Sequence, residues 1–255
     1  MFQDLIILFA AGTLAGAMNA IAGGGSFVGF PAMVFTGLPS VAANASNTVA
    51  LVPGTIASAA AYLTGSRRMG LTGLANVPFP ALLGVSTAGG LAGALLLLST
   101  PVITFDAVVP WLLLFATITF AFGRQFGAWL RTHLRLGPRT LLPLQFLLGI
   151  YGGYFGGAVG IMMLAAWSLL DGADIKSLNP TRTVIVSAMN GIAVICFVVA
   201  GQVHWPQTLT MLAGGILGGF AGARLGQRLP ASLIRGIVMA ITVIITLIFF
   251  RRAYA

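Results

Sequence analysis

The sequence predicts an all-α integral membrane protein built from two inverted repeats of transmembrane helices, and three observations carry this prediction. Hydrophobic residues make up 58% of the 255-residue chain and charged residues only 7%, whereas a soluble domain carries roughly 25% charged residues. Apolar runs long enough to cross a membrane fill most of the chain. A glycine-rich break also interrupts an apolar run near the start of each half.

Apolar runs and helix breakers divide the chain into ten expected helical segments. Their expected bounds are 5–21, 26–37, 42–65, 72–98, 104–122, 141–157, 161–170, 181–200, 207–228 and 231–250. Segments 26–37 and 161–170 are too short to cross a hydrocarbon core of about 30 Å at a rise of about 1.5 Å per residue. Because each follows a glycine break, we expect each repeat to start with a re-entrant hairpin that is buried in protein or lines a watery cavity.

Matching motifs in the two halves predict the repeat. One set shares an offset of 137 residues and pairs Gly12 with Gly149, Gly16 with Gly153 and Gly23 with Gly160. Two further sets share offsets of 135 and 129 residues and pair 44–48 with 179–183 and 90–94 with 219–223. Five segments per half is an odd number, so the second repeat enters the membrane from the opposite side and the repeats are inverted.

The domain organisation follows from these matches. We expect a single membrane domain over residues 1–255, with repeat one at about 5–122 and repeat two at about 141–250. A basic linker, 123–140, joins them, and the excess of arginine predicts that it is cytoplasmic. Counting segments outward from the linker places the loops Thr100–Phe105 and Gly201–Trp205 outside.

The glycines divide into two groups. Pairs spaced four residues apart suit close helix packing, and we favour that role for Gly12 and Gly16, Gly89 and Gly93, and Gly218 and Gly222. Three consecutive glycines at 23–25 are more than packing needs, so they predict a break in the helix.

The charge balance excludes several classes of protein. Lys and Arg total 13, Asp and Glu total 4 and Glu is absent. The basic residues are few and lie mostly between apolar runs, so we interpret them as topology signals and expect no nucleic-acid partner. All four acidic residues lie at expected helix ends; they are Asp4, Asp106, Asp171 and Asp174. Cation pumps and proton relays usually carry ionisable side chains within the membrane. The positions of the aspartates therefore disfavour both of these classes.

An enzymatic function is also disfavoured. A nucleophile–base pair or a metal cluster would need neighbouring His, Asp, Glu or Cys side chains. His133 falls in the basic linker, His204 at a membrane edge and Cys196 in an apolar run. We therefore expect no catalytic residues, no metal and no cofactor.

Polar side chains at two expected helix starts are candidate substrate-binding residues. They are Asn44, Ser46, Asn47 and Thr48 in the first half and Asn179, Thr181, Arg182 and Thr183 in the second. Helix starts expose unpaired N–H groups and partial positive charge, which favours anions. Ser46 and Thr181 suit a capping role equally well. Arg182 corresponds to the neutral Asn47 of the first repeat, so only the second repeat carries a charge at this position. The alternative role for Arg182 is to anchor the protein at the cytoplasmic face.

The breaks and two amides complete the candidate site. Asn19 precedes the first break, and Asn190 lies in an apolar segment where an unpaired amide is costly. The glycines of the breaks, whose N–H groups can approach a ligand closely, are Gly23, Gly24, Gly25, Gly156, Gly157 and Gly160.

Several of these motifs together resemble the TauE/SafE family of membrane permeases. They are the run Asn19–Gly25, the segment Ala42–Asn47, the glycines of 149–160 and the segment Asn179–Arg182. The resemblance covers almost the whole chain. It implies a multi-pass protein of a bacterial-type inner membrane that transports sulfur-containing anions, sulfite or sulfonates, by alternating access.

Alternatives stay open at this point. An ion-coupled carrier of another small solute or of a cation is the second function class, since backbone carbonyls can bind Na⁺. Besides the lipid bilayer and a small anion, the expected partners include a coupling ion, proton or sodium. Assembly as a homodimer is also open.

Overall fold

The computed structural model describes residues 2–22, 24–64, 71, 73–74, 76–133, 138–167, 178–226 and 231–254. Apart from one isolated bridge, Leu74–Val77, all secondary structure in these residues is helical. The helices are α1 (Phe2–Ala22), α2 (Ser26–Phe35), α3 (Ser40–Thr64), α4 (Phe79–Ser99), α5 (Val102–His133), α6 (Pro138–Tyr154), α7 (Val159–Trp167), α8 (Asn179–Val199), α9 (Trp205–Gly226) and α10 (Ala231–Tyr254).

The described helices confirm an all-α chain with membrane-spanning segments. Five of them are long and apolar enough to cross a membrane, over Phe2–Ala20, Phe79–Ser99, Val102–Phe122, Asn179–Val199 and Gly236–Tyr254. Large apolar side chains are exposed on the outer surface, as expected of a surface that faces lipid; Ile103 and Val199, for example, are more than 80% exposed. Both expected short segments are helices, with 10 residues in α2 and 9 in α7.

Most expected bounds differ from the observed ones by a few residues; the expected segment 141–157, for example, runs into the second break, whereas α6 ends at Tyr154. Three further differences matter for the site. Helix α4 begins at Phe79 and not at 72, because Leu74 pairs with Val77 in an isolated bridge and Asn76 has a φ of 66°. Prolines at 78 and 80 favour a helix start there. Helix α5 continues past 122 to His133, so much of the expected linker is helical. Helix α3 begins at Ser40, which places Asn44–Thr48 in its second and third turns and not at its start.

Both glycine breaks separate a long helix from a short one. The first lies between the end of α1 at Ala22 and the start of α2 at Ser26. The second spans Phe155–Ala158, where Gly156 and Ala158 have positive φ angles of 77° and 60° that no α-helix accommodates. The second break is therefore a true helix interruption.

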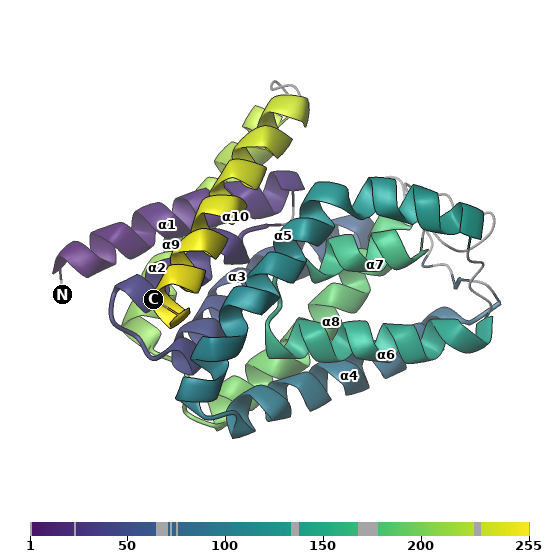
Figure 1. Cartoon of the computed structure of the whole chain (residues 1–255), viewed down its shortest axis with the longest axis horizontal. Helices are drawn as coiled ribbons and strands as arrows, with labels where there is room; N and C mark the ends of the chain where they lie inside the picture. Colours follow the sequence, from purple (N-terminus) through teal and green to yellow (C-terminus); the bar gives the residue numbers. More distant parts are fainter. Residues whose placement is uncertain are drawn as a thin grey trace.

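Two long helix pairs form the frame of the molecule: α1 packs along α9, and α6 packs along α4 (Figure 1). Glycines at both contacts let the backbones meet. A Cβ on Gly12 would overlap the carbonyl of Met211, and one on Gly93 would overlap the carbonyl of Ile150. Equivalent overlaps occur at Gly16, Gly89, Gly149, Gly153, Gly218 and Gly222. The expected packing role is confirmed for the three predicted pairs, Gly12 and Gly16, Gly89 and Gly93, and Gly218 and Gly222, and Gly149 and Gly153 share it.

Between the two pairs, α3 and α8 pack against each other, and α2 and α7 lie beside them. An aromatic cluster fixes α2 against the second break, since the Phe30 ring lies 5.8 Å from Phe155 and 6.3 Å from Phe105. A buried polar chain ties α7 to α6 and α4: the Trp167 indole donates to Gln145, which donates to Ser86. These contacts hold the short helices at the ends of the breaks.

Candidate functional site

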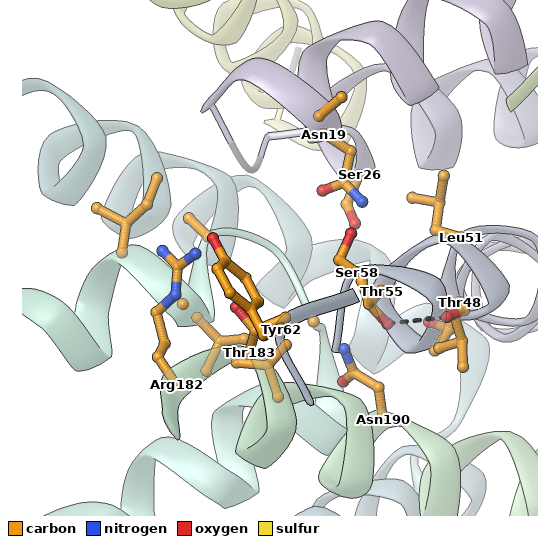
Figure 2. A pocket seen from close by; sticks show the side chains of 18 residues that line it. Asn19, Ser26, Thr48, Leu51, Thr55, Ser58, Tyr62, Arg182, Thr183 and Asn190 are labelled. Atoms are coloured by element: carbon orange, nitrogen blue, oxygen red, sulfur yellow. Dashed lines mark hydrogen bonds between the residues drawn. The ribbon is translucent and has the colours of Figure 1, made fainter. Parts of the chain in front are cut away.

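A cavity of about 210 Å³ lies where the two breaks meet α3 and α8. The first break contributes Asn19, Ala20 and Ser26, and the second contributes Gly156 and Ala158–Ile161. The remaining lining residues are Thr48, Leu51, Val52, Thr55, Ser58 and Tyr62 of α3 and Arg182, Thr183, Val186 and Asn190 of α8. Segments from both halves of the chain therefore build one small polar chamber (Figure 2).

The lining of α3 follows from its helical period. Thr48, Leu51, Thr55, Ser58 and Tyr62 recur every three or four residues, so they lie on one face of the helix. Burial changes along this face: Thr48 is 8% exposed, whereas Ser58 is exposed. The cavity is accordingly closed near Thr48 and more open towards the end of α3.

The N-termini of both short helices border the cavity. Ser26 is the first residue of α2, and Val159 and Gly160 are the first two of α7. Several first-turn N–H groups already donate to carbonyls of the breaks, those of α2 to Gly24 and Gly25 and those of α7 to Ala158. The helix dipole still adds partial positive charge at both helix starts. Two helix starts of this kind facing one cavity favour a negatively charged occupant.

Arg182 supplies a full positive charge at the same place. It lies in the first turn of α8, and its side chain packs across Gly160, with Cδ 3.6 Å and Cζ 3.8 Å from the position that a Cβ would take there. The hydroxyl of Tyr62 is near enough to interact with it electrostatically. No carboxylate in the part of the chain that the structure describes pairs with this guanidinium. Its five N–H donors are thus available to a ligand.

Four hydroxyl groups of the cavity are already engaged with their own helices. Thr48 donates to the carbonyl of Asn44 at 2.8 Å, Thr55 to that of Val52 at 2.8 Å and Ser58 to that of Gly54 at 2.9 Å. Thr183 donates in the same way to the carbonyl of Asn179 at 2.8 Å. The hydroxyl oxygens remain available as acceptors.

Comparison with known proteins places this architecture in a family. The model of the sulfite exporter TauE/SafE family matches residues 8–249 of the chain. The chain belongs to the TauE/SafE family. A probable membrane transporter protein of Haemophilus influenzae is 31% identical over 84% of this chain and 81% of its own length.

Two other relatives have names of the same kind. A probable membrane transporter protein of Sinorhizobium sp is 29% identical over 85% of this chain and 80% of its own length. The probable membrane transporter protein YfcA of Escherichia coli is 24% identical over 83% of this chain and 76% of its own length. No solved structure matches the chain significantly. This TauE/SafE protein is therefore a multi-pass membrane transporter of the cell membrane that handles a small substrate.

The cavity brings together seven residues that the sequence predicted for the site of this TauE/SafE protein. They are Asn19, Thr48, Gly156, Gly160, Arg182, Thr183 and Asn190. Asn190 is 8% exposed, and Figure 2 shows it at the edge of the cavity opposite Ser26. Its Oδ1 atom is buried without a hydrogen-bond partner among the described residues.

Three predicted residues of α3 point elsewhere. Asn44 donates through Nδ2 to the carbonyl of Tyr154 at 2.9 Å, at the end of α6. Ser46 accepts a 3.0 Å hydrogen bond from the backbone N–H of His204, which ties α3 to the start of α9. Asn47 is fully buried against Gly29 of α2. In this TauE/SafE protein Asn44 and Ser46 hold helices together, whereas Nδ2 and Oδ1 of Asn47 are buried without a hydrogen-bond partner among the described residues. None of the three lines the cavity.

The other predicted residues lie beside the cavity. Thr181 is fully buried and Asn179 half-buried in the first turn of α8. Gly24 and Gly25 are buried in the first break, and Gly157 packs against the ring of Phe155. Gly23 falls outside the described residues.

Sequence reasoning missed four polar lining residues: Ser26, Thr55, Ser58 and Tyr62. The last three continue the face of α3 that Thr48 begins, two turns and more beyond the motif on which the prediction relied. The signal was present as polar residues spaced by three and four in an apolar helix, which normally face protein or a cavity and not lipid.

Proposed function

We propose that this protein moves a small sulfur-containing anion, of the sulfite or sulfonate class, across the cell membrane by alternating access. The observation that carries the proposal is the guanidinium of Arg182, which faces the cavity with no carboxylate partner among the described residues. A planar fork of N–H donors suits an oxyanion, and the starts of α2 and α7 add positive potential. The cavity is of a size for a small solute.

The arrangement of helices supports two inverted repeats. Exchanging α1–α5 with α6–α10 turns the pair α1–α9 into α6–α4, and both are principal contacts. The same exchange turns α3–α9 into α8–α4 and α2–α10 into α7–α5, while α3–α8 and α5–α10 map onto themselves. We propose a pseudo-two-fold axis in the membrane plane that passes between α3 and α8. An experimental structure in lipid with parallel repeats would refute it.

This symmetry gives alternating access a physical basis. In the proposal, α2 and α7 are the short arms of re-entrant hairpins, and the breaks that they share with α1 and α6 meet at the cavity. Inverted repeats can exchange conformations, so that a cavity open on one side closes there and opens on the other.

Transport by purified protein in proteoliposomes tests the role of Arg182. Losing a charge-assisted hydrogen bond costs roughly 1.5–3 kcal/mol, so Arg182→Ala should weaken anion affinity about ten- to a hundredfold. Arg182→Lys keeps the charge but loses the fork, and it should fall between the wild type and Arg182→Ala. Uptake of sulfite is the measurement.

A matched control separates recognition from surface anchoring. Arg224, near the end of α9, is exposed and its guanidinium lies 4.0 Å from the centre of the Phe220 ring, away from the cavity lining. Arg224→Ala should leave uptake close to the wild-type value. Normal anion uptake by a folded Arg182→Ala protein would reduce Arg182 to an anchor and end the proposal.

The alternative of a cation carrier is less compatible with the cavity, because Arg182 is the only formally charged residue of its described lining. Coupling to a proton or to sodium remains part of the proposal. Sulfite titrates near neutral pH, so a proton can cross on the substrate without a protein carboxylate. A sulfite transport rate that does not change when a proton gradient is imposed would contradict this route. Whether two copies form a homodimer has no bearing on the cavity, which one chain builds.

A further inference from the structure

Two matched side chains, Asn47 of α3 and Arg182 of α8, make corresponding contacts in the two halves of the chain. They are related by the repeat offset of 135 residues. Asn47 lies over Gly29 of α2, and Arg182 lies over Gly160 of α7. The sequence offset matches Gly160 with Gly23, but by its contact Gly160 corresponds to Gly29. In each half, therefore, a side chain of the longer helix covers a glycine of the short one.

The contact in the first half is much closer than the contact in the second. A Cβ on Gly29 would overlap Oδ1 of Asn47, whose side chain is fully buried. A Cβ on Gly160 would lie 3.6 Å from the nearest atom of Arg182, which is an ordinary van der Waals separation, and Arg182 is only half-buried. Helices α2 and α3 are therefore closed against each other at Asn47, whereas α7 and α8 leave room at Arg182.

The cavity opens at the end where the contact is loose. Figure 2 shows Tyr62 beside Arg182, with Thr48 on the opposite side of the view. Thr48 follows Asn47 in the chain and is 8% exposed, while Tyr62 is half-buried. The structure is thus closed at the Asn47 end of the cavity and open at the Arg182 end.

Alternating access, as proposed above, requires a second state in which the two ends have exchanged. In that state Arg182 closes over Gly160 as tightly as Asn47 closes over Gly29 here. The free-energy costs of the two closures differ. Closing the Asn47 end buries a neutral amide whose Nδ2 and Oδ1 have no partner among the described residues. Closing the other end buries a guanidinium, and an unpaired charge costs far more to bury than an unpaired amide.

A bound anion removes the cost of burying Arg182. The described lining of the cavity contains no carboxylate that could pair with the guanidinium. An anion in the cavity supplies this partner, so it stabilises the closed state of the Arg182 end over the open one. A carrier that cannot close this end without an anion cannot return empty to the other side of the membrane.

We infer that this protein is an anion exchanger, in which each anion that crosses the membrane is followed by an anion that crosses in the opposite direction. The inference rests on the proposed function and adds to it the mode of transport. Arg182 then has two effects: its N–H groups bind the anion, and its charge prevents the empty carrier from closing.

Uptake of radiolabelled sulfite into proteoliposomes, with and without unlabelled sulfite inside, tests the inference. Wild-type uptake should be at least about tenfold faster with internal sulfite, the factor that corresponds to one charge-assisted hydrogen bond. Valinomycin and equal potassium concentrations on both sides hold the membrane potential at zero, so that accumulated charge cannot stop net uptake. Protein-free vesicles measure leakage through the lipid.

Variants test the role of the charge. Arg182→Asn gives the second half the neutral residue of the first, so at saturating sulfite the stimulation by internal sulfite should fall from about tenfold towards one. Arg182→Lys keeps the charge and should keep the stimulation, although its affinity is weaker. Arg224→Asn is the matched control, because Arg224 is exposed and lies away from the cavity lining. Thermal unfolding shows whether each variant is folded, and Arg182→Gln replaces Arg182→Asn if that protein does not fold.

The failure of the inference is distinguishable from failure of the proposed function. No sulfite uptake by the wild type under either condition would defeat the proposed function itself. Equal uptake with and without internal sulfite would overturn the exchange mechanism and leave the anion site intact; this result is expected if Asp171 or Asp174, which lie outside the described residues, pairs with Arg182 on closure. An Arg182→Asn protein that still requires internal sulfite, or that transports under neither condition, would show that another feature blocks the empty carrier.

Discussion

At the scale of single residues, Asn44 holds the second glycine break in place. Helix α6 ends at Tyr154, and the last carbonyls of any helix lack an intrahelical partner. The Asn44 amide, 1% exposed, donates to the Tyr154 carbonyl from α3, which is 110 residues away in the chain. A side chain of the first half thus satisfies the backbone of the second.

We expect Asn44→Ala to lower the free energy of unfolding by about 1–3 kcal/mol, because it leaves the partly buried carbonyl of Tyr154 unpaired. Thermal unfolding of the purified protein in detergent measures the change. Ser58→Ala is the control, since Ser58 is exposed and bonds only within α3. An Asn44→Ala protein as stable as the Ser58→Ala protein would show that the contact contributes nothing.

How much of the site the sequence could predict depended on helix register. The glycine breaks and the charge of Arg182 are local signals, and both lie at the cavity. No local signal in the sequence shows which polar residues of α3 face the cavity. Ser46 and Asn47 turn away from the face that carries Thr48, and only the contacts with α9 and α2 decide what they meet. Tertiary packing supplies that information.

At the scale of helices, glycine spacing sets how closely α1 and α9 approach. A Cβ on Gly218 would overlap the carbonyl of Thr13, whereas one on the adjacent Gly219 would stay 3.8 Å from the carbonyl of Gly16. The two neighbours have the same helix propensity but different surroundings, so they separate the effect of packing from that of the helix itself.

Gly218→Ala should therefore destabilise the protein by about 1–3 kcal/mol through overpacking, while Gly219→Ala should be neutral or slightly stabilising because alanine favours helix. Melting temperatures of the two variants under identical detergent conditions provide the comparison. Equal melting temperatures would mean that α9 shifts freely along α1.

Helix ends were less predictable than helix existence. The short helices α2 and α7 followed from an apolar run after a glycine break. The extension of α5 to His133 did not, because the apolar run ends near 122 while the backbone continues to be helical. Hydropathy reports where a helix meets lipid, not where its hydrogen bonds end.

At the scale of the whole molecule, orientation in the membrane follows from charge asymmetry. The loop between α4 and α5 and that between α8 and α9 both connect helices at ends that are poor in Lys and Arg. The stretch 124–139, which includes the end of α5 and the start of α6, holds four arginines, at 124, 131, 135 and 139. The positive-inside rule predicts a cytoplasmic location for that stretch.

Cysteine labelling in intact cells checks this orientation, in a Cys196→Ala background. An impermeant reagent should modify Ile103→Cys, a position 85% exposed at the start of α5, and should leave His133→Cys unmodified until the cells are opened. Labelling of position 133 in intact cells would invert the orientation.

The pairing of α1 with α9 has a consequence for the order of synthesis. The N-terminal helix leaves the ribosome first, yet the surface that covers Gly12 and Gly16 belongs to one of the last helices made. Until Met211 and Gly215 arrive, the glycine face of α1 has only lipid beside it. In the same way, α4 waits for α6. The α4–α6 pair can therefore form once α6 is made, whereas the α1–α9 pair has to wait for the ninth of the ten described helices.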